Sequence, residues 1–251
     1  MTNSMKDSPT LKSQRYDLSG AIVPVNDLSQ QERDAMFALM ICYYKTDRNI
    51  FDNDLDEKEH VILLRDSLSG EIKGFSTMKR LDLDTVTALF SGDTIIQEDY
   101  RHTTVLPQYW AKLAFGTRDR IKELEPERKV YWFLITSGYK TYRYLPVFFR
   151  EFYPRHDRST PENAQHIMHK LAKTRYADEY DQSTGIIHLQ NATPLRDGVA
   201  EIKANRLKNA HVAFFKSINP GHTQGDELVC LTEIDPHNLT RAGRRMVDAN
   251  I

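Results

Sequence analysis

The sequence has few cysteines, no long hydrophobic run and almost no net charge, and each absence argues against a class of protein. Its two cysteines, Cys42 and Cys230, are too few to indicate a disulfide-stapled secreted chain. No run approaches the roughly 20 apolar residues that a membrane-spanning helix needs. With 34 basic and 35 acidic residues, the formal net charge of −1 does not favour nucleic acid or an anionic membrane as a partner. We therefore expect a cytoplasmic protein with no membrane span.

Metal-ligand patterns are also scarce. His166 and His169 are three apart on a predicted helix, a spacing that allows joint ligation. We expect them to be surface residues, and the looser group Asp54, Asp56 and His60 has no better support as a metal site. We expect no metal site and no permanently bound cofactor.

The chain is predicted to fold as one domain. Residues 1–19 are polar, lack the apolar core of a signal peptide and are predicted to form a flexible leader. No linker divides residues 20–251, for which we predict a single α/β domain with additional helices in its C-terminal part. Cys42 and Cys230 lie in apolar patterns and are expected to be buried thiols, although the sequence leaves a disulfide between them open.

Hydrophobic periodicity and turn residues indicate strands interspersed with helices. Ser29 and Glu32 have the spacing of a capping box before a helix. Gly70 marks the turn of an antiparallel hairpin, and Gly92 a bend in the strand that follows. The charged stretch 45–60 is predicted to be a loop. The expected strands are 21–25, 60–66, 72–83, 86–97, 129–137, 185–190 and 226–235, and the expected helices are 29–43, 105–124, 138–155 with a break near Pro146, 160–180 with Thr160 as its N-cap, and 198–219.

The stretch IIQEDYRHTTVLPQYWAKL joins a strand, an acidic turn, a Tyr-Arg pair and a helix. Together with the order of the strands, it resembles the GNAT acyltransferase superfamily, whose fourth strand ends in a V-x-P-E-Y-R-G-x-G-x-G/A-type signature before a helix. The resemblance covers residues 21–154, and strand 226–235 would close the sheet. It implies a mixed, mostly antiparallel central sheet flanked by helices. In this sheet, strand 129–137 would splay from strand 86–97 to form an acyl-donor cleft.

The turn departs from that signature where the family binds the pyrophosphate of its donor. The family's glycines let backbone N–H groups approach the pyrophosphate at a helix N-terminus, whereas this chain has His102, Thr103 and Thr104. Either the donor lacks the coenzyme A pyrophosphate, as on an acyl carrier protein, or the site has no such ligand. The threonine hydroxyls and a cationic His102 can still hydrogen-bond a single phosphate.

Four further residues are candidates for donor binding by the same resemblance. Ile96 and Arg101 flank the acidic turn, and Arg101 can pair with a phosphate or form a local salt bridge with its acidic neighbours. Thr136 and Ser137 end the buried strand, where they can hydrogen-bond a pantetheine amide or cap the next helix.

Acyl transfer to an amine needs a base for the ammonium proton and an acid for the leaving thiolate. Asp93 lies on the strand before the turn, where the family often places its carboxylate base; the alternative is an exposed strand carboxylate. Tyr139, Tyr142 and Tyr144 follow the buried strand, where the family commonly has a tyrosine acid. We take Tyr142 as the candidate, against the alternative that all of these tyrosines are packing residues.

The aromatic segment YKTYRYLPVFFREFY suggests apolar walls for a long acyl chain, or equally a hydrophobic core. Its interleaved tyrosines and cations would also suit a single-stranded nucleic acid, but the many apolar residues fit that use less well, so no nucleic-acid partner is expected. The hypothesis is an N-acyltransferase that favours a longer acyl group, with an acyl-coenzyme A or acyl-carrier-protein thioester as cosubstrate and a small-molecule amine as acceptor. The alternatives are a GNAT-fold binding or assembly protein without catalysis, and an unrelated α/β enzyme.

Overall fold

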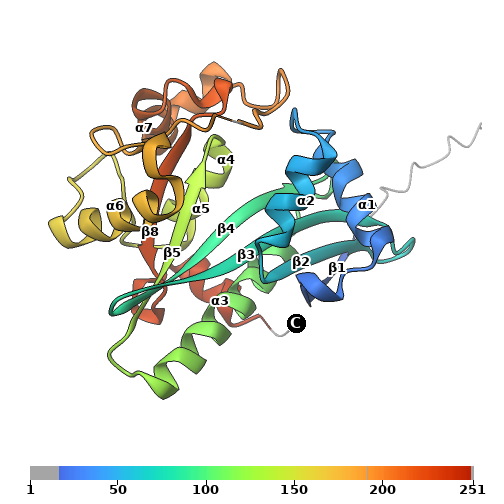
Figure 1. The fold of residues 1–251 in the computed structure, drawn as a ribbon, viewed down its shortest axis with the longest axis horizontal. Helices are drawn as coiled ribbons and strands as arrows, with labels where there is room; N and C mark the ends of the chain where they lie inside the picture. Colours follow the sequence, from blue (N-terminus) through green and yellow to red (C-terminus); the bar gives the residue numbers. More distant parts are fainter. Residues whose placement is uncertain (1–16, 191, 250–251) are drawn as a thin grey trace, which may run out of the picture.

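The computed structural model describes residues 17–190 and 192–249, and its core is one eight-stranded mixed sheet (Figure 1). The strand order is β1-β2-β3-β4-β5-β8-β7-β6, and β4–β5 is the one parallel pair among the described strands. This confirms the predicted α/β class with a mostly antiparallel sheet. The strands are β1 (Leu18–Pro24), β2 (His60–Asp66), β3 (Ile72–Leu83), β4 (Val86–Ile96), β5 (Lys129–Thr136), β6 (Tyr180–Asp181), β7 (Ile186–Ile187) and β8 (Glu227–Glu233).

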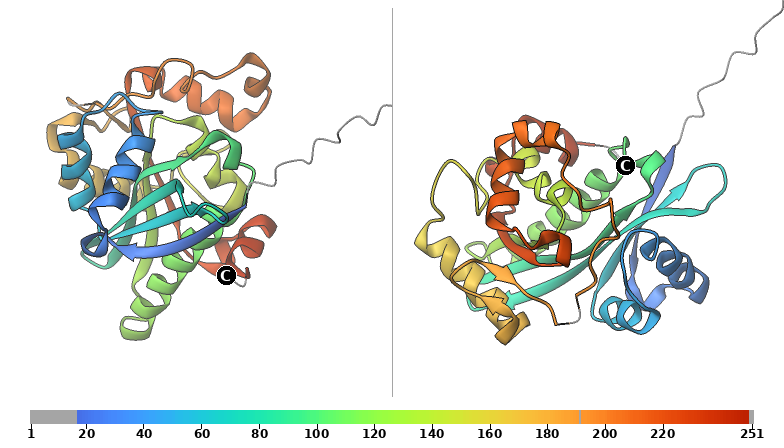
Figure 2. Two further views of the ribbon diagram at one scale, coloured as in Figure 1. Left: turned by 90° about the vertical axis from the view of Figure 1, so that its right-hand side faces the viewer. Right: turned by 90° about the horizontal axis from the view of Figure 1, so that it is seen from above.

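Helices cover both faces of the sheet (Figure 2). One face carries α1, α2 and α6, whose apolar side chains form two neighbouring clusters on the sheet. The other face carries α3, α4, α5, α7 and α8, which share the largest cluster. The helices are α1 (Gln30–Met40), α2 (Arg48–Asp56), α3 (Val105–Leu124), α4 (Tyr139–Tyr142), α5 (Tyr144–Phe148), α6 (Glu162–Tyr176), α7 (Ala210–Ile218) and α8 (Arg241–Val247).

Local sequence signals fixed several of these elements. Ser29 accepts a hydrogen bond from the Glu32 N–H, and the Glu32 carboxylate accepts one from the Ser29 N–H, which confirms the predicted capping box. Gly70 has a φ of 74° in the β2–β3 hairpin, a conformation that favours glycine. The predicted helix 105–124 has the bounds of α3. β1 begins at Leu18, within the predicted leader, and residues 1–16 lie outside the described ones.

The stretch 45–60 was predicted to be a loop and instead contains the helix α2. The Asp47 side chain caps it by accepting from the Ile50 N–H at 3.0 Å. Phe51 and Leu55, four residues apart, point into the core with exposed fractions of 2% and 1%. Two apolar positions in a charged stretch gave too weak a periodic signal for the helix to be predicted.

Four other expectations were wrong in detail. The break near Pro146 lies instead at Arg143, between α4 and α5, and Pro146 occupies the first turn of α5, where a missing N–H costs no helical hydrogen bond. Thr160 does not cap α6, whose N-cap is Pro161. The Cys42 thiol is exposed because α1 ends before it, whereas Cys230 is buried as expected; both cysteines are free. The predicted helix 198–219 is shorter: a 3-10 turn (Ala204–Lys208) precedes α7.

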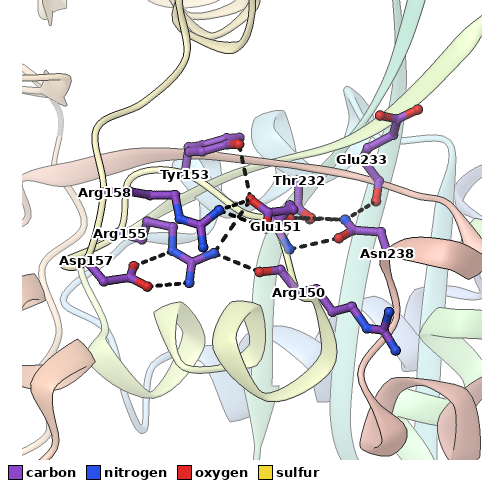
Figure 3. A network of polar contacts seen from close by, with 9 residues as sticks. All are labelled: Arg150, Glu151, Tyr153, Arg155, Asp157, Arg158, Thr232, Glu233 and Asn238. Carbon is purple, nitrogen blue, oxygen red and sulfur yellow. Dashed lines mark hydrogen bonds and ion pairs between the residues drawn. The ribbon is translucent and has the colours of Figure 1, made fainter.

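A polar network holds the segment after α5 against β8 (Figure 3). Tyr153 forms a β-bridge with Leu231, and the Asn238 amide donates to the carbonyl oxygens of Glu151 and Glu233 at 3.0 and 2.8 Å. Arg158 donates to the Glu151 carboxylate at 3.1 Å. The network anchors one end of α5, the helix that borders the site described below.

Candidate active site

The sheet opens between β4 and β5. Their parallel pairing ends at Ser91 and Leu134, but β4 continues to Ile96 beside β3, and β5 continues to Thr136 beside β8. The two strands therefore diverge toward their carboxyl ends, as Figure 1 shows. This is the splay that the sequence resemblance implied. Among residues 17–190 and 192–249, no strand pairs with the edge of β4 beyond Ser91 on its β5 side.

A bulge in β4 lies where the strands part. Ser76 of β3 pairs with Thr94 and Met78 pairs with Ser91, so Gly92 and Asp93 together stand opposite one residue. A Cβ atom at Gly92 would lie 2.5 Å from the Thr77 hydroxyl oxygen and 2.6 Å from Lys58 Cε, which explains the glycine. The predicted bend at this position is confirmed. The bulge directs Asp93 to the face of α1, α2 and α6.

Three neighbouring hollows surround the opening and meet at Thr94 and Thr141, which line all of them. The mouth cleft, about 250 Å³, lies above the carboxyl ends of β4 and β5. The α2–α6 pocket, about 220 Å³, lies between those two helices. The apolar branch, about 30 Å³, runs toward α3, α5 and α8. The three hollows therefore adjoin one another at the opening.

Basic side chains gather at the mouth cleft. Arg101 and Lys140 line it; Arg101 Nε donates to the Ile96 carbonyl oxygen at 2.9 Å, and its guanidinium lies 4.9 Å from the centre of the Tyr43 ring. Burial lowers the pKa of Lys140, and the charge of Arg101 lowers it further, with smaller contributions from Arg206 and Lys203. The cleft is therefore suited to a phosphate or another anion.

The turn before α3 contributes less to the hollows than the sequence suggested. Ile96 and Arg101 line the mouth cleft, whereas His102, Thr103 and Thr104 lie outside the three hollows. His102 and Thr104 are exposed, and the Thr103 hydroxyl donates to the Tyr100 carbonyl oxygen at 3.2 Å.

The α2–α6 pocket holds two carboxyl groups with raised pKa values. Burial raises the pKa of Asp93 to about 7, and the nearby charge of Asp54 adds to this while Lys58 opposes it. Burial raises the pKa of Glu227 to about 8, hydrogen bonds from Ser137 oppose the shift, and the charge of Asp93 adds to it. The charge of Asp93 therefore disfavours ionisation of Glu227.

Thr136 and Ser137 lie at the α2–α6 pocket and not at the mouth cleft. The Thr136 hydroxyl donates to the Gly138 carbonyl oxygen and accepts from the Gly138 N–H, both at 3.0 Å, so it closes the turn after β5. Ser137 hydrogen-bonds Glu227. Both side chains are buried, with exposed fractions of 5% and 4%.

The structure does not bring Tyr142 to the opening. Its side chain is fully buried, its ring packs on Phe152 and Phe215, and its hydroxyl donates to the Pro154 carbonyl oxygen at 2.9 Å. Tyr139 and Tyr144 line the mouth cleft instead, and Tyr144 also lines the apolar branch.

Sequence reasoning missed Glu227 and Tyr44. Tyr44 lines both the mouth cleft and the α2–α6 pocket, and burial, Asp93 and Glu227 together raise its pKa far above the usual range. Glu227 is the first residue of β8. An acidic residue at the start of an otherwise apolar strand was the one sequence signal that could have identified it. Tyr44 follows α1 directly and had no distinguishing pattern.

Among the residues that the structure describes, no group of three or more His, Cys, Asp and Glu side chains is placed to hold a metal ion. In the same residues, no helix is both long enough and apolar enough to cross a membrane.

No protein-family model and no curated protein matches the chain. Among solved structures, it is similar to an acetyltransferase of the GNAT family from Staphylococcus aureus, with 15% identity over 57% of this chain and 93% of that chain and a TM-score of 0.38. It is similar to the GNAT-family N-acetyltransferase YhbS from Escherichia coli in complex with CoA, with 14% identity over 56% and 71% of the two chains and a TM-score of 0.33. It is also similar to FeeM, an N-acyl amino acid synthase from uncultured soil microbes, with 13% identity over 55% and 81% and a TM-score of 0.36. The chain is similar in fold to GNAT-family proteins and divergent from them in sequence.

Proposed function

We propose that this protein is an N-acyltransferase that moves an acyl group from a thioester donor to an amine. The observation that carries the proposal is the opening between β4 and β5, which joins a basic cleft on one side to a carboxylate-bearing pocket on the other. A thioester that enters the mouth cleft meets, at Thr94 and Thr141, an amine that enters from the α2–α6 pocket.

The donor's phosphate would bind through side chains, because the turn lacks the glycines of a backbone cradle. Arg101 is oriented by the Ile96 carbonyl and the Tyr43 ring, and Lys140 lies beside it in the cleft. This arrangement accommodates the single phosphate of a carrier-borne phosphopantetheine as well as coenzyme A. The unpaired edge of β4 offers backbone groups to the pantetheine amides.

Asp93 is the proposed base. The amine arrives as an ammonium, and a carboxyl group with a pKa near 7 can take its proton at neutral pH. The amine nitrogen then attacks the thioester carbonyl carbon, the C–N bond forms, and the C–S bond breaks. The thiolate leaves and takes a proton from an acid at the site. The nitrogen gives up its second proton, which restores that acid, so the products are an amide and a free thiol.

Tyr144 replaces Tyr142 as the proposed acid for the thiolate. It lines the mouth cleft and the apolar branch, where the thioester would lie. Burial raises the pKa of its hydroxyl and the charge of Arg101 opposes this shift, so the oxygen carries its proton at neutral pH.

The experiment is to incubate the purified protein with acyl-coenzyme A and acyl-carrier-protein thioesters and a panel of small amines, and to follow free thiol and amide. We expect consumption of at least one donor that depends on an amine, and loss of about 10²–10⁴ in rate for Asp93→Asn. Glu233→Gln, at the other end of β8, is the matched control and should retain full rate. A protein that neither binds nor consumes any thioester would overturn the proposal.

A second candidate is a GNAT-fold binding protein without catalysis. The observation in its favour is that His102, Thr103 and Thr104 replace the glycines and lie outside the hollows. This candidate predicts thioester binding without amine-dependent consumption, and equal donor affinity in wild type and Asp93→Asn.

A further inference from the structure

The apolar branch is an extension of the mouth cleft. The two hollows share Thr94, Thr141 and Tyr144, so the acyl group of a thioester held at the opening points into the branch. Apart from these three and two serines, its walls are apolar: Leu106, Pro107, Trp110, Trp132, Leu134, Phe148, Phe149 and Met246. Its volume of about 30 Å³ has room for about two water-sized groups.

The end of the branch at the base of the opening is rigid. The Ser91 hydroxyl accepts hydrogen bonds from the indole N–H groups of Trp132 and Trp110, at 2.9 and 3.3 Å. The two indole rings lie 4.5 Å apart, and Phe149 packs against both, at 6.4 Å from Trp110 and 5.9 Å from Trp132. Moving either indole would leave a buried N–H without an acceptor, so this end does not yield to a longer chain.

The wall formed by α8 is different. Met246 is buried, with an exposed fraction of 6%, and its unbranched side chain has three rotatable bonds and no polar partner to keep. Its helix is held close to α5, because a Cβ atom at Gly243 would lie 2.3 Å from the Phe148 carbonyl oxygen. The backbone there is fixed, and the Met246 side chain is the adaptable part of the wall.

We infer that Met246 sets the length of the acyl group that the protein accepts. This inference rests on the proposed acyltransferase function and deepens it. With Met246 in place, the branch takes an acyl group of about two to four carbons. Shortening Met246 opens the wall between the Trp110–Trp132 pair and α8 to a longer chain.

The test measures dissociation constants for acetyl-, butyryl-, hexanoyl- and octanoyl-coenzyme A by calorimetry, with wild type and Met246→Ala. Wild type should bind the two shorter donors most tightly. Met246→Ala should move the tightest binding to a longer donor and raise the affinity for octanoyl relative to acetyl by about tenfold or more. Met246→Val, a smaller truncation, should shift the tightest binding towards longer donors in the same way. It replaces the alanine variant in the test if that variant does not fold.

Met168→Ala is the matched control, because Met168 is equally buried but lies on α6, away from the branch. It should lower the melting temperature without moving the length preference. Unchanged preference in both Met246 variants, or a wild type that binds octanoyl most tightly, would overturn the inference while leaving acyl transfer intact. Failure of every thioester to bind would overturn the proposed function, and the inference with it.

Discussion

At the residue scale, the chemistry of the opening depends on carboxyl groups that are kept from water and from strong cation partners. Asp93 reaches the α2–α6 pocket because the β4 bulge turns it there, and Glu227 reaches it from the start of β8. The charge of Asp93 raises the pKa of Glu227, and the charges of both carboxylates raise the pKa of Tyr44. Such shifted groups in a cleft are typical of sites that move protons.

The first prediction concerns pH. The raised pKa of Asp93 means that its contribution to stability is fully present below about pH 4, the unfolded value, and is lost as pH rises through about 7. The groups that face it are Asp54 and Lys58 near α2, Glu227 on β8 and Tyr44. Between pH 4 and 8, we expect the free energy of unfolding of Asp93→Asn to fall by about 2–4 kcal/mol less than that of wild type. Thermal melts of both proteins from pH 4 to 8 measure this; parallel curves would contradict it.

A second prediction separates the two tyrosines. Tyr144→Phe should lower kcat by about 10²-fold with little change in melting temperature, because Tyr144 lines the mouth cleft as the proposed acid. Tyr142→Phe should leave kcat unchanged and cost about 1–2 kcal/mol, because it removes the hydrogen bond to the half-buried Pro154 carbonyl oxygen. Steady-state kinetics with chemical denaturation distinguish them, and the reverse pattern would restore Tyr142 as the acid.

At the element scale, the bulge in β4 and the early end of its pairing with β5 create the opening. If β4 and β5 were paired along their full length, the backbone groups at the edge of β4 would be hydrogen-bonded to β5. The opening between the two strands would then be absent. α2, which was not predicted from the sequence, forms one wall of the α2–α6 pocket with Phe51 and Asp54. α6 supplies the opposite wall with Arg175 and Tyr176.

The third prediction is made for Gly92→Ala. The new Cβ would meet Thr77 and Lys58 at 2.5 and 2.6 Å, so the bulge must shift and carry Asp93 with it. We expect a loss of about 1–3 kcal/mol and reduced turnover. Gly116→Ala in α3 is the control: its Cβ meets nothing within 4 Å, and removing a helical glycine should stabilise by about 0.5–1 kcal/mol. Urea denaturation of both variants checks the signs, and a neutral Gly92→Ala would argue against a tightly packed bulge.

At the scale of the whole molecule, charge is unevenly placed. The chain carries a formal net charge of −1, yet the charges of Arg101, Arg206 and Lys203, from two other segments, lower the pKa of Lys140 at the mouth cleft, opposed by Glu98. A local concentration of one sign on a near-neutral protein favours an oppositely charged ligand at that place.

The fourth prediction follows from this charge. Arg101→Gln and Lys140→Gln should each weaken coenzyme A binding about three- to tenfold at low salt, with a smaller difference at 1 M salt, where screening is short-ranged. Lys129→Gln, at the other end of the sheet beside Glu233, is the control and should change nothing. Titrations at two salt concentrations measure the effect, and salt-independent binding would count against a phosphate at this mouth.

Local patterns in the sequence were sufficient for most of the fold. The capping box at Ser29, the turn at Gly70 and the periodicity of α3 involve residues a few positions apart, and their signals are short-range. The splay of β5 from β4 was anticipated by resemblance alone, since no periodicity encodes it. α2 was not predicted because its N-cap residue and its two buried apolar residues are weak helix signals within a strongly charged stretch.

The sequence by itself determined which segments along the chain form most of the strands, the α/β class and the place of Asp93 at a bend before the acidic turn. Only the tertiary structure decided which side chains meet there. It set Glu227 beside Asp93 because β8 inserts next to β5, and it turned Tyr144 to the cleft and Tyr142 into the core because the helix after β5 breaks at Arg143. Contacts between distant segments follow from strand order and from packing around a shared core, and neither is written in the spacing of neighbouring residues.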